Sequence, residues 1–346
     1  MRLAHVRERH APAGAPWRLA AALGSGTPPD PWLDLEVARR RAAAADRRLA
    51  HNAVLFRQPV TTLDEHLTRG LRVAAIGELL ERFAQRDEAD EAVLDATDLA
   101  FGPPLLHAPA LRDFYAFEVH VAAAWARRGG EVPEAWYRLP VFYFSNVSEL
   151  RGPDEAVWAP RGSLELDYEL EIAALVDTSV RDLAEERAEE AIGGYTILDD
   201  WSARDLQRDE TQVRLGPAKG KDFASSIGPW LVTPDELADA RTSGSTAPHL
   251  EMSATVNGVE TSRGTWASSH YSFAQMLARA SADVTVRPGE LLGSGTVGTG
   301  SLMESRERTI GRYLQPGDEV VLEVERLGRL RTPIVARPDG DPRPVG

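Results

Sequence analysis

The sequence predicts an α+β chain with a mixed-β core, in which a small N-terminal domain precedes a larger β-rich domain. From about residue 106 onward, segments rich in β-branched and aromatic residues dominate, and few helical segments interrupt them. Residues 1–105 instead contain Ala/Arg-rich helical stretches and no cluster of chemically useful groups. We expect two domains, residues 1–105 and 106–346, because the proline-rich segment 101–110 between them disfavours helix.

Each element is predicted from its local pattern. The N-terminal domain is expected to have helices over residues 35–50 and 66–86. Turn signals are Asn257-Gly258, which predicts a β-hairpin, and the Pro-Gly turns at 287–290 and 315–318, which each precede a strand. This irregular order of elements argues against a repeating βαβ sheet. The helices expected in the larger domain cover residues 113–128, 181–196 and 272–281, and the strands cover residues 138–144, 164–176, 228–233, 253–262, 290–297 and 318–336.

Composition excludes several classes of function. The chain has 346 residues, of which 43% are hydrophobic and 27% charged, as in an ordinary globular protein. Its net charge of −14 argues against nucleic-acid or anionic-membrane binding, and no apolar run approaches the ~20 residues that span a bilayer. The start lacks the apolar segment of a secretory signal, so we expect a cytoplasmic location. A small anionic substrate would need a cationic pocket, for which the candidates are Arg128, Arg204, Lys219 and Lys221.

An acidic stretch is the most informative motif. Alternation with apolar residues would place all of its carboxylates on one face of an extended strand. Either this face is solvated at a sheet edge, or it holds a hard cation. Asp113 upstream and Asp200 downstream add oxygen donors that suit Mg²⁺, Mn²⁺ or Ca²⁺, whereas zinc would favour Cys or several His, and Cys is absent. The acidic residues of this stretch are Glu165, Asp167, Glu169 and Glu171.

Two further segments carry candidate catalytic groups. A helix over residues 113–128 would place Asp113 and His120 on one face, two turns apart. His120 would then face the cleft, unless it is a hydrogen-bonded structural histidine. Asp200, Arg204 and Gln207 have the i, i+4, i+7 spacing of one helix stripe; the alternative is a surface ion pair of ~0.3–0.5 kcal/mol.

Two glycine-rich segments complete the candidates. Segment 216–222 lacks a spacer residue and the Ser/Thr of a phosphate loop, so we exclude nucleotide binding and interpret Lys221 as a point charge near a ligand or a solvated lysine. Segment 293–301 either lets the backbone approach a small ligand, with Thr296 as a donor, or is a flexible turn. Glu304 follows it and can orient His120.

Taken together, these segments resemble the fumarylacetoacetate hydrolase family. The similar segments are DFYAFEVH, LPVFYF, LDYELEIA, DDWSARDLQ, KGKDFASSIGPWLVT, GSGTVGTGSLME and LQPGDEVVLEVE, which cover most of residues 110–325. The resemblance implies rolled β-sheets, a small N-terminal domain that is SH3-like or a helical cap, a divalent cation and a homodimer. Ser305-Arg306 departs from the family pattern, where a more apolar continuation is expected.

The resemblance also implies residue roles. The metal ligands would be Asp113, Glu169, Glu171 and Asp200. Lys221 would lie close to the cation, and His120 with Glu304 would activate water. Ligand contacts would come from Arg204, Gln207, Tyr143, Thr296 and Arg128.

These roles predict a metal-dependent hydrolase that cleaves a C–C bond in a 1,3-diketone or 2,4-diketo acid, such as a fumarylacetoacetate-like or acylpyruvate-like compound. Activated water would attack a carbonyl, and Lys221, Arg204 and Gln207 would stabilise the oxyanion charge. One alternative is a decarboxylase or a keto-enol tautomerase on the same fold, and another is a noncatalytic binding scaffold. His120 favours the hydrolase, because the alternative reactions need no activated water.

Overall fold

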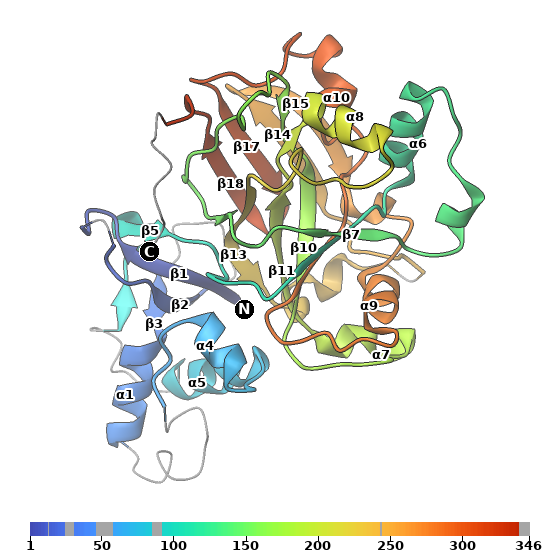
Figure 1. Ribbon diagram of the computed structural model, residues 1–346. Helices are drawn as coiled ribbons and strands as arrows, with labels where there is room; N and C mark the ends of the chain where they lie inside the picture. Colours follow the sequence, from blue (N-terminus) through green and yellow to red (C-terminus); the bar gives the residue numbers. More distant parts are fainter. Residues whose placement is uncertain (13, 25–30, 46–57, 85–91, 243, 339–346) are drawn as a thin grey trace.

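The computed structural model describes residues 1–12, 14–24, 31–45, 58–84, 92–242 and 244–338 (Figure 1). Its strands are β1 (Arg2–Glu8), β2 (Arg18–Ala22), β3 (Trp32–Asp34), β4 (Val93–Leu94), β5 (Leu99–Phe101), β6 (Leu111–Phe114), β7 (Phe142–Ser145), β8 (Leu150–Arg151), β9 (Leu166–Asp167), β10 (Leu170–Val176), β11 (Ile192–Asp199), β12 (Ser202–Ala203), β13 (Ser225–Val232), β14 (Glu251–Val256), β15 (Val259–Thr265), β16 (Leu291–Gly293), β17 (Glu319–Val324) and β18 (Gly328–Pro333).

Helices are fewer and mostly short. The α-helices are α1 (Leu35–Ala45), α4 (Leu63–Thr68), α5 (Ala74–Ala84), α6 (Glu118–Arg127), α7 (Glu185–Ala188), α8 (Arg204–Gln212), α9 (Phe273–Ser281) and α10 (Leu302–Ser305). The 3₁₀ helices are η1 (Ala96–Asp98), η2 (Glu134–Tyr137), η3 (Glu189–Ala191), η4 (Pro234–Ala240), η5 (Trp266–Ser268) and η6 (Arg306–Arg308). Within the described ranges, none of these helices has the length and apolar character needed to cross a membrane.

One large mixed sheet organises the molecule. Its strand order is β4-β3-β2-β1-β13-β11-β10-β16-β6-β7, with β5 paired to β1 and β8 paired to β13. The pairs β16–β6 and β13–β8 are parallel, whereas the other pairs in this sheet are antiparallel. Mixed strand directions with few helices confirm the predicted α+β, mixed-β class.

The N-terminal region extends this sheet. Strand β1 pairs with β13, so that Arg2 lies opposite Val232. The sequence pattern predicted helices here and missed strands β1 to β5. Helices α1, α4 and α5 lie within the expected helical stretches or overlap them, and residues 46–50 and 85–86 lie outside the described residues. The division at residues 105 and 106, and an SH3-like or helical-cap character of the first part, stay predictions.

A smaller sheet of order β15-β14-β17-β18 packs beside the large one. Its hairpin turns at Asn257 and Gly258, with φ of 52° and 78°, which confirms the predicted turn. The two Pro-Gly turns precede β16 and β17, as expected.

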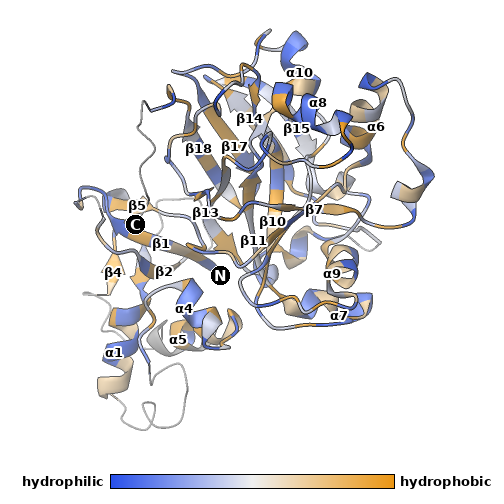
Figure 2. Cartoon of the chain, viewed as in Figure 1, coloured by the Kyte–Doolittle hydropathy of each residue, from blue (hydrophilic) through white to orange (hydrophobic). Residues whose placement is uncertain are grey.

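The core runs through the centre of the large sheet. All seven residues of β10 and all eight of β11 are buried, and Figure 2 shows hydrophobic residues along β10. Helix α9 begins with a capping box between Ser272 and Gln275 and buries its apolar face, which confirms the prediction for residues 272–281. Glu171 lies in this otherwise apolar strand with a side chain 1% exposed, so it needs polar partners.

Three predicted elements are wrong in part. The helix predicted over residues 113–128 begins only at Glu118, because residues 113–114 belong to β6, which pairs with β16 and β7. Residues 192–196 belong to β11, so the helix predicted over 181–196 is limited to α7 and η3. The strand predicted over 164–176 is interrupted between Asp167 and Leu170. In each case sheet pairing with distant segments overrides the local pattern.

Candidate active site

A cavity of about 760 Å³ is lined by residues of β6, β7, β10, α6 and α8. Glu304 lies behind it, in contact with His120. Lys219, a candidate cation from the sequence, does not line the cavity and pairs with Asp222 at 2.8 Å. The predicted site residues that line the cavity are Asp113, His120, Arg128, Tyr143, Glu169, Glu171, Asp200, Arg204, Gln207, Lys221 and Thr296.

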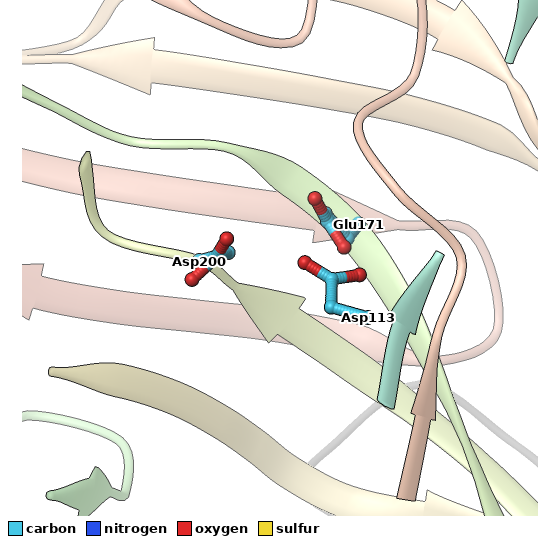
Figure 3. Close-up of side chains that lie close together, drawn as sticks. All are labelled: Asp113, Glu171 and Asp200. Atoms are coloured by element: carbon cyan, nitrogen blue, oxygen red, sulfur yellow. The ribbon is translucent and has the colours of Figure 1, made fainter. Parts of the chain in front are cut away.

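Three carboxylates converge at the inner end of the cavity. Asp113 comes from β6, Glu171 from β10, and Asp200 from the residue after β11. One oxygen of each lies within 4.8 Å of the others, and Figure 3 shows the three side chains directed toward one another. All three are at most 3% exposed. Burial, together with the charges of the neighbouring carboxylates, raises the pKa of both Asp113 and Glu171 well above the usual range.

The three carboxylates fit a hard divalent cation. The Oδ1 atoms of Asp113 and Asp200 are buried and have no hydrogen-bond partner among the described residues. Such orphaned anionic oxygens are costly unless a cation compensates them, and oxygen-only ligands suit Mg²⁺, Mn²⁺ or Ca²⁺. The backbone also leaves room for Asp113, because a Cβ added at Gly293 would lie 2.3 Å from Asp113 Oδ1. The ligand roles themselves stay predictions.

Glu169 lies apart from this cluster. Its carboxylate contacts Lys221 Nζ and lies 2.8 Å from Arg204 Nη2. Burial alone would raise the pKa of Glu169, but the nearby charges of Lys221 and Arg204 lower it well below its usual range. A metal-ligand role for Glu169 stays a prediction, and in this structure the carboxylate is held by two cations.

Lys221 connects Glu169 to the carboxylate cluster. Its Nζ lies 2.5 Å from Asp200 Oδ2 and also contacts Glu169. Burial disfavours the ammonium, yet the charges of Asp200 and Glu169 raise the pKa of Lys221. Gly220 allows this loop to pack on α8, because a Cβ there would lie 2.8 Å from the backbone nitrogen of Gln207. Lys221 is thus a fixed cation in the cavity, not a solvated lysine.

His120 and Glu304 form a buried pair. His120 Nδ1 lies 2.7 Å from Glu304 Oε2, and each side chain is 5% exposed. Glu304 also accepts hydrogen bonds from Ser301 Oγ at 3.1 Å and from the Thr299 N–H at 3.3 Å. A carboxylate at Nδ1 favours the tautomer that carries its proton there, which leaves Nε2 as the base. Nε2 lies 3.9 Å from Glu169 Oε1, on the cavity side of the ring.

Helix α8 supplies Arg204 and Gln207. Arg204 Nη1 donates to Gln207 Oε1 at 3.1 Å, and Arg204 Nε donates to Asp167 Oδ2 at 2.8 Å. The single helix stripe expected for Asp200, Arg204 and Gln207 is wrong, because α8 begins at Arg204 and Asp200 directly follows β11, outside the helix. The surface ion pair considered for Arg204 is also excluded, since its partners Asp167 and Glu169 are buried.

Two side chains predicted to contact substrate donate hydrogen bonds to carboxylates of the cluster. Tyr143 donates its hydroxyl to Asp200 Oδ2 at 2.6 Å, and Thr296 Oγ1 donates to Glu171 Oε1 at 3.1 Å. The Gly295 N–H donates to Glu171 Oε2 at 3.1 Å. Burial raises the pKa of Tyr143 well above its usual range, so it stays a donor. Arg128 lines the cavity and is exposed, and the substrate-binding roles of all three side chains stay predictions.

The acidic stretch divides among separate partners, so the expectation of four carboxylates on one face is wrong. Glu165 pairs with Arg208 at 3.0 Å near the surface. Asp167 accepts from the N–H groups of Leu302 and Met303 at 2.7 and 2.9 Å, which fixes the start of α10 next to Glu304. The sequence also gave no role to Asp199, which accepts from the Glu169 N–H at 3.0 Å. Its position next to Asp200 is the only signal we recognise.

Comparison with known proteins places these features in a family. The chain is 32% identical over 195 residues to 2,4-didehydro-3-deoxy-L-rhamnonate hydrolase of Sphingomonas sp. (strain SKA58), which covers 56% of this chain and 64% of that relative. Among solved structures, it resembles 5-carboxymethyl-2-hydroxymuconate delta-isomerase from Mycobacterium smegmatis, with a TM-score of 0.63, 21% identity and coverage of 97% of this chain and 100% of the other.

A second solved structure is fumarylpyruvate hydrolase from Pseudomonas aeruginosa in complex with Mn²⁺ and pyruvate, with a TM-score of 0.54, 22% identity and coverage of 69% and 92%. At these identities the structures show a shared fold. Residues 110–335 match the model of the fumarylacetoacetate hydrolase C-terminal domain, which confirms the resemblance and, at the level of the family, the expectation of an enzyme. The chain belongs to the fumarylacetoacetate hydrolase family.

Proposed function

We propose that this protein is a metal-dependent hydrolase that cleaves a C–C bond in a 2,4-diketo acid or related 1,3-diketone, using water activated by His120. The observation that carries the proposal is the His120–Glu304 pair, which shares one cavity with the cluster of Asp113, Glu171 and Asp200. The Sphingomonas and Pseudomonas proteins are both named as hydrolases, which supports the proposal, and the Pseudomonas structure contains Mn²⁺ and pyruvate, which supports it further.

The cation would be held by Asp113, Glu171 and Asp200, with Glu169 as a further predicted ligand. When bound, a divalent cation supplies Lewis-acid polarisation of carbonyl oxygens. Lys221, which is 4% exposed and contacts Asp200, provides a fixed positive charge next to this position. The cavity thus joins an oxygen-rich site to cationic groups that suit the carboxylate of a diketo acid.

The position of His120 beside Glu304 supports the following sequence of steps in bond cleavage. Glu304 accepts a hydrogen bond from His120 Nδ1–H, so that Nε2 is free to remove a proton from water, and the hydroxide adds to the carbonyl carbon. The C–C bond then breaks, its electron pair forms an enolate on the departing fragment, and the imidazolium returns the proton to that carbon. Lys221 and Arg204 stabilise the oxyanion charge, and the loss of such a donor typically costs ~10²–10³ in rate.

A second candidate is an isomerase or decarboxylase acting on a 2-oxo acid. The fold shared with the Mycobacterium smegmatis isomerase favours it, because the same His120 can move a proton between carbons without water. A noncatalytic scaffold is disfavoured, since buried carboxylates that repel one another destabilise a fold that gains nothing from them.

Isotope incorporation tests the proposal. Acylpyruvates, fumarylacetoacetate-like diketo acids and oxaloacetate are incubated with the protein and Mg²⁺, Mn²⁺ or Ca²⁺ in H₂¹⁸O. Hydrolysis predicts loss of enol absorbance and one ¹⁸O in the new carboxylate of the acyl fragment. Isomerised or decarboxylated products without cleavage would instead establish the second candidate. Metal analysis of the purified protein identifies the cation.

The proposal includes a homodimer and a cytoplasmic location. Light scattering after gel filtration tests the first, and cell fractionation tests the second.

A further inference from the structure

Several arginines line the outer part of the cavity, and the partners of those that are paired, such as Glu165 with Arg208 at 3.0 Å, lie outside the lining. The acidic residues in its lining are the three of the cluster and Glu169, all at the inner end. Arg127 and Arg128 also line the cavity and have no ion pair within the part of the chain that the structure describes, and the guanidinium carbon of Arg128 lies 6.0 Å from the centroid of the Trp125 ring. The chain as a whole has a net charge of −14, so this local concentration of positive charge favours the binding of an anion at the mouth of the cavity.

Arg306 is a further cation in the lining of the cavity. It lies at the start of η6, and its side chain is 24% exposed. Its guanidinium carbon lies 4.6 Å from the centroid of the Tyr313 ring, and both residues line the cavity. Stacking on an aromatic ring fixes the plane of the guanidinium, and a fixed plane favours two parallel hydrogen bonds to a carboxylate.

The existing contacts of Arg306 leave its guanidinium able to bind a carboxylate. Nη1 donates to the carbonyl of Met303 at 3.4 Å, and Nη2 lies 3.8 Å from Glu307 Oε1. Glu307 is 81% exposed, so this long ion pair contributes little to stability and can be exchanged for a ligand. The sequence also marks the position, because Ser305-Arg306 stands where an apolar continuation is expected.

We propose that Arg306 determines specificity by binding a second carboxylate at the end of the substrate distant from the acidic cluster. This inference rests on the proposed function and narrows its substrate class to diketo acids with two carboxylates. The diketo acid end lies at Asp113, Glu171 and Asp200, and the acyl chain extends toward α10, where Arg306 and Tyr313 receive its terminal carboxylate.

A matched pair of substrates tests the inference. Fumarylpyruvate carries a distal carboxylate, and its distal monoamide has nearly the same shape without the charge. The wild type should prefer the dicarboxylate by about 10- to 100-fold in kcat/KM, as expected for a bidentate charged interaction of ~1.5–3 kcal/mol. R306Q should reduce this preference to less than about threefold, mainly through KM, while the rate with the monoamide changes little.

Further variants separate specificity from folding. R187Q removes an exposed arginine of α7 outside the cavity and should keep the full preference. R306K keeps the charge but loses the planar fork, so it should recover only part of the preference. Thermal unfolding of each variant confirms that it folds.

The two proposals fail in distinguishable ways. If the wild type cleaves neither probe, the proposed function is wrong, and calorimetric binding of both probes to wild type and R306Q still decides the role of Arg306. If R306Q keeps the preference, or weakens both probes equally, the inference about Arg306 is overturned.

Discussion

Replacing Glu304 by Gln should strongly slow the reaction while leaving the fold and metal binding intact. Glu304 Oε2 lies 2.7 Å from His120 Nδ1, and both side chains are 5% exposed. A hydrogen bond to a charged group contributes ~1.5–3 kcal/mol, and each 1.36 kcal/mol corresponds to tenfold in rate. The E304Q variant should therefore lose roughly 10- to 150-fold in kcat.

The surroundings of Glu304 make this loss hard to avoid. Its Oε1 accepts from the Thr299 N–H, and its Oε2 accepts from Ser301 Oγ as well as facing His120. An amide in the same place must direct its NH₂ either at the Thr299 donor or at His120. The first costs a hydrogen bond, and the second favours the tautomer with the proton on Nε2, which cannot act as a base.

The assay compares kcat at saturating diketo acid and cation for wild type, E304Q and E118Q. Glu118 lies on α6, as His120 does, but it is exposed, accepts a hydrogen bond from Tyr137 and lies outside the cavity. The E118Q variant therefore controls for the loss of a carboxylate. Calorimetric titration with Mn²⁺ should give similar affinity for all three proteins. A kcat for E304Q within twofold of the wild type, with folding unchanged, would refute the role of the His120–Glu304 pair.

Three further predictions concern the metal site and stability. G293A should weaken Mn²⁺ binding more than tenfold in calorimetry, because the new Cβ would lie 2.3 Å from Asp113 Oδ1; unchanged affinity would contradict the cluster geometry. Removal of the cation by a chelator should abolish activity and lower the Tm. Free cation at 100 times its Kd should raise the free energy of unfolding again by about 2.7 kcal/mol. A Tm that does not depend on the cation would count against a metal site. Hydrogen bonds from Arg312 and other donors lower the pKa of Asp318 to about 2. The ionised Asp318 therefore stabilises the fold fully at pH values above its unfolded-state pKa of ~3.9, and this stabilisation is lost as the pH falls through about 2. D318N should therefore lower the free energy of unfolding by about 1–2 kcal/mol at pH 7, as measured by urea unfolding. The difference from the wild type should shrink between about pH 4 and pH 2. A difference that does not change with pH would show that the charge of Asp318 is irrelevant.

The sequence could identify the chemistry of the site better than its geometry. Residue types and the family resemblance predict four metal ligands, and three of them, Asp113, Glu171 and Asp200, converge, whereas Glu169 lies apart. Local pattern could not show that Asp113 lies on a strand, because β6 is defined by pairing with β16, about 180 residues later in the chain. For the same reason the N-terminal strands were missed, since β1 is completed by β13.

The separation of Glu169 from Glu171 shows where pattern reasoning ends. Both are glutamates two residues apart, and an uninterrupted strand would give them the same surroundings. The break between β9 and β10 instead brings Glu169 to Lys221 and Arg204, which lower its pKa, while Glu171 faces Asp113 and Asp200 and its pKa is raised by burial and repulsion. Glu169 is therefore compensated by two fixed cations, of which Lys221 also contacts Asp200. The carboxylates left without full compensation are those of the cluster, so this part of the cavity, rather than the acidic stretch as a whole, favours a divalent cation.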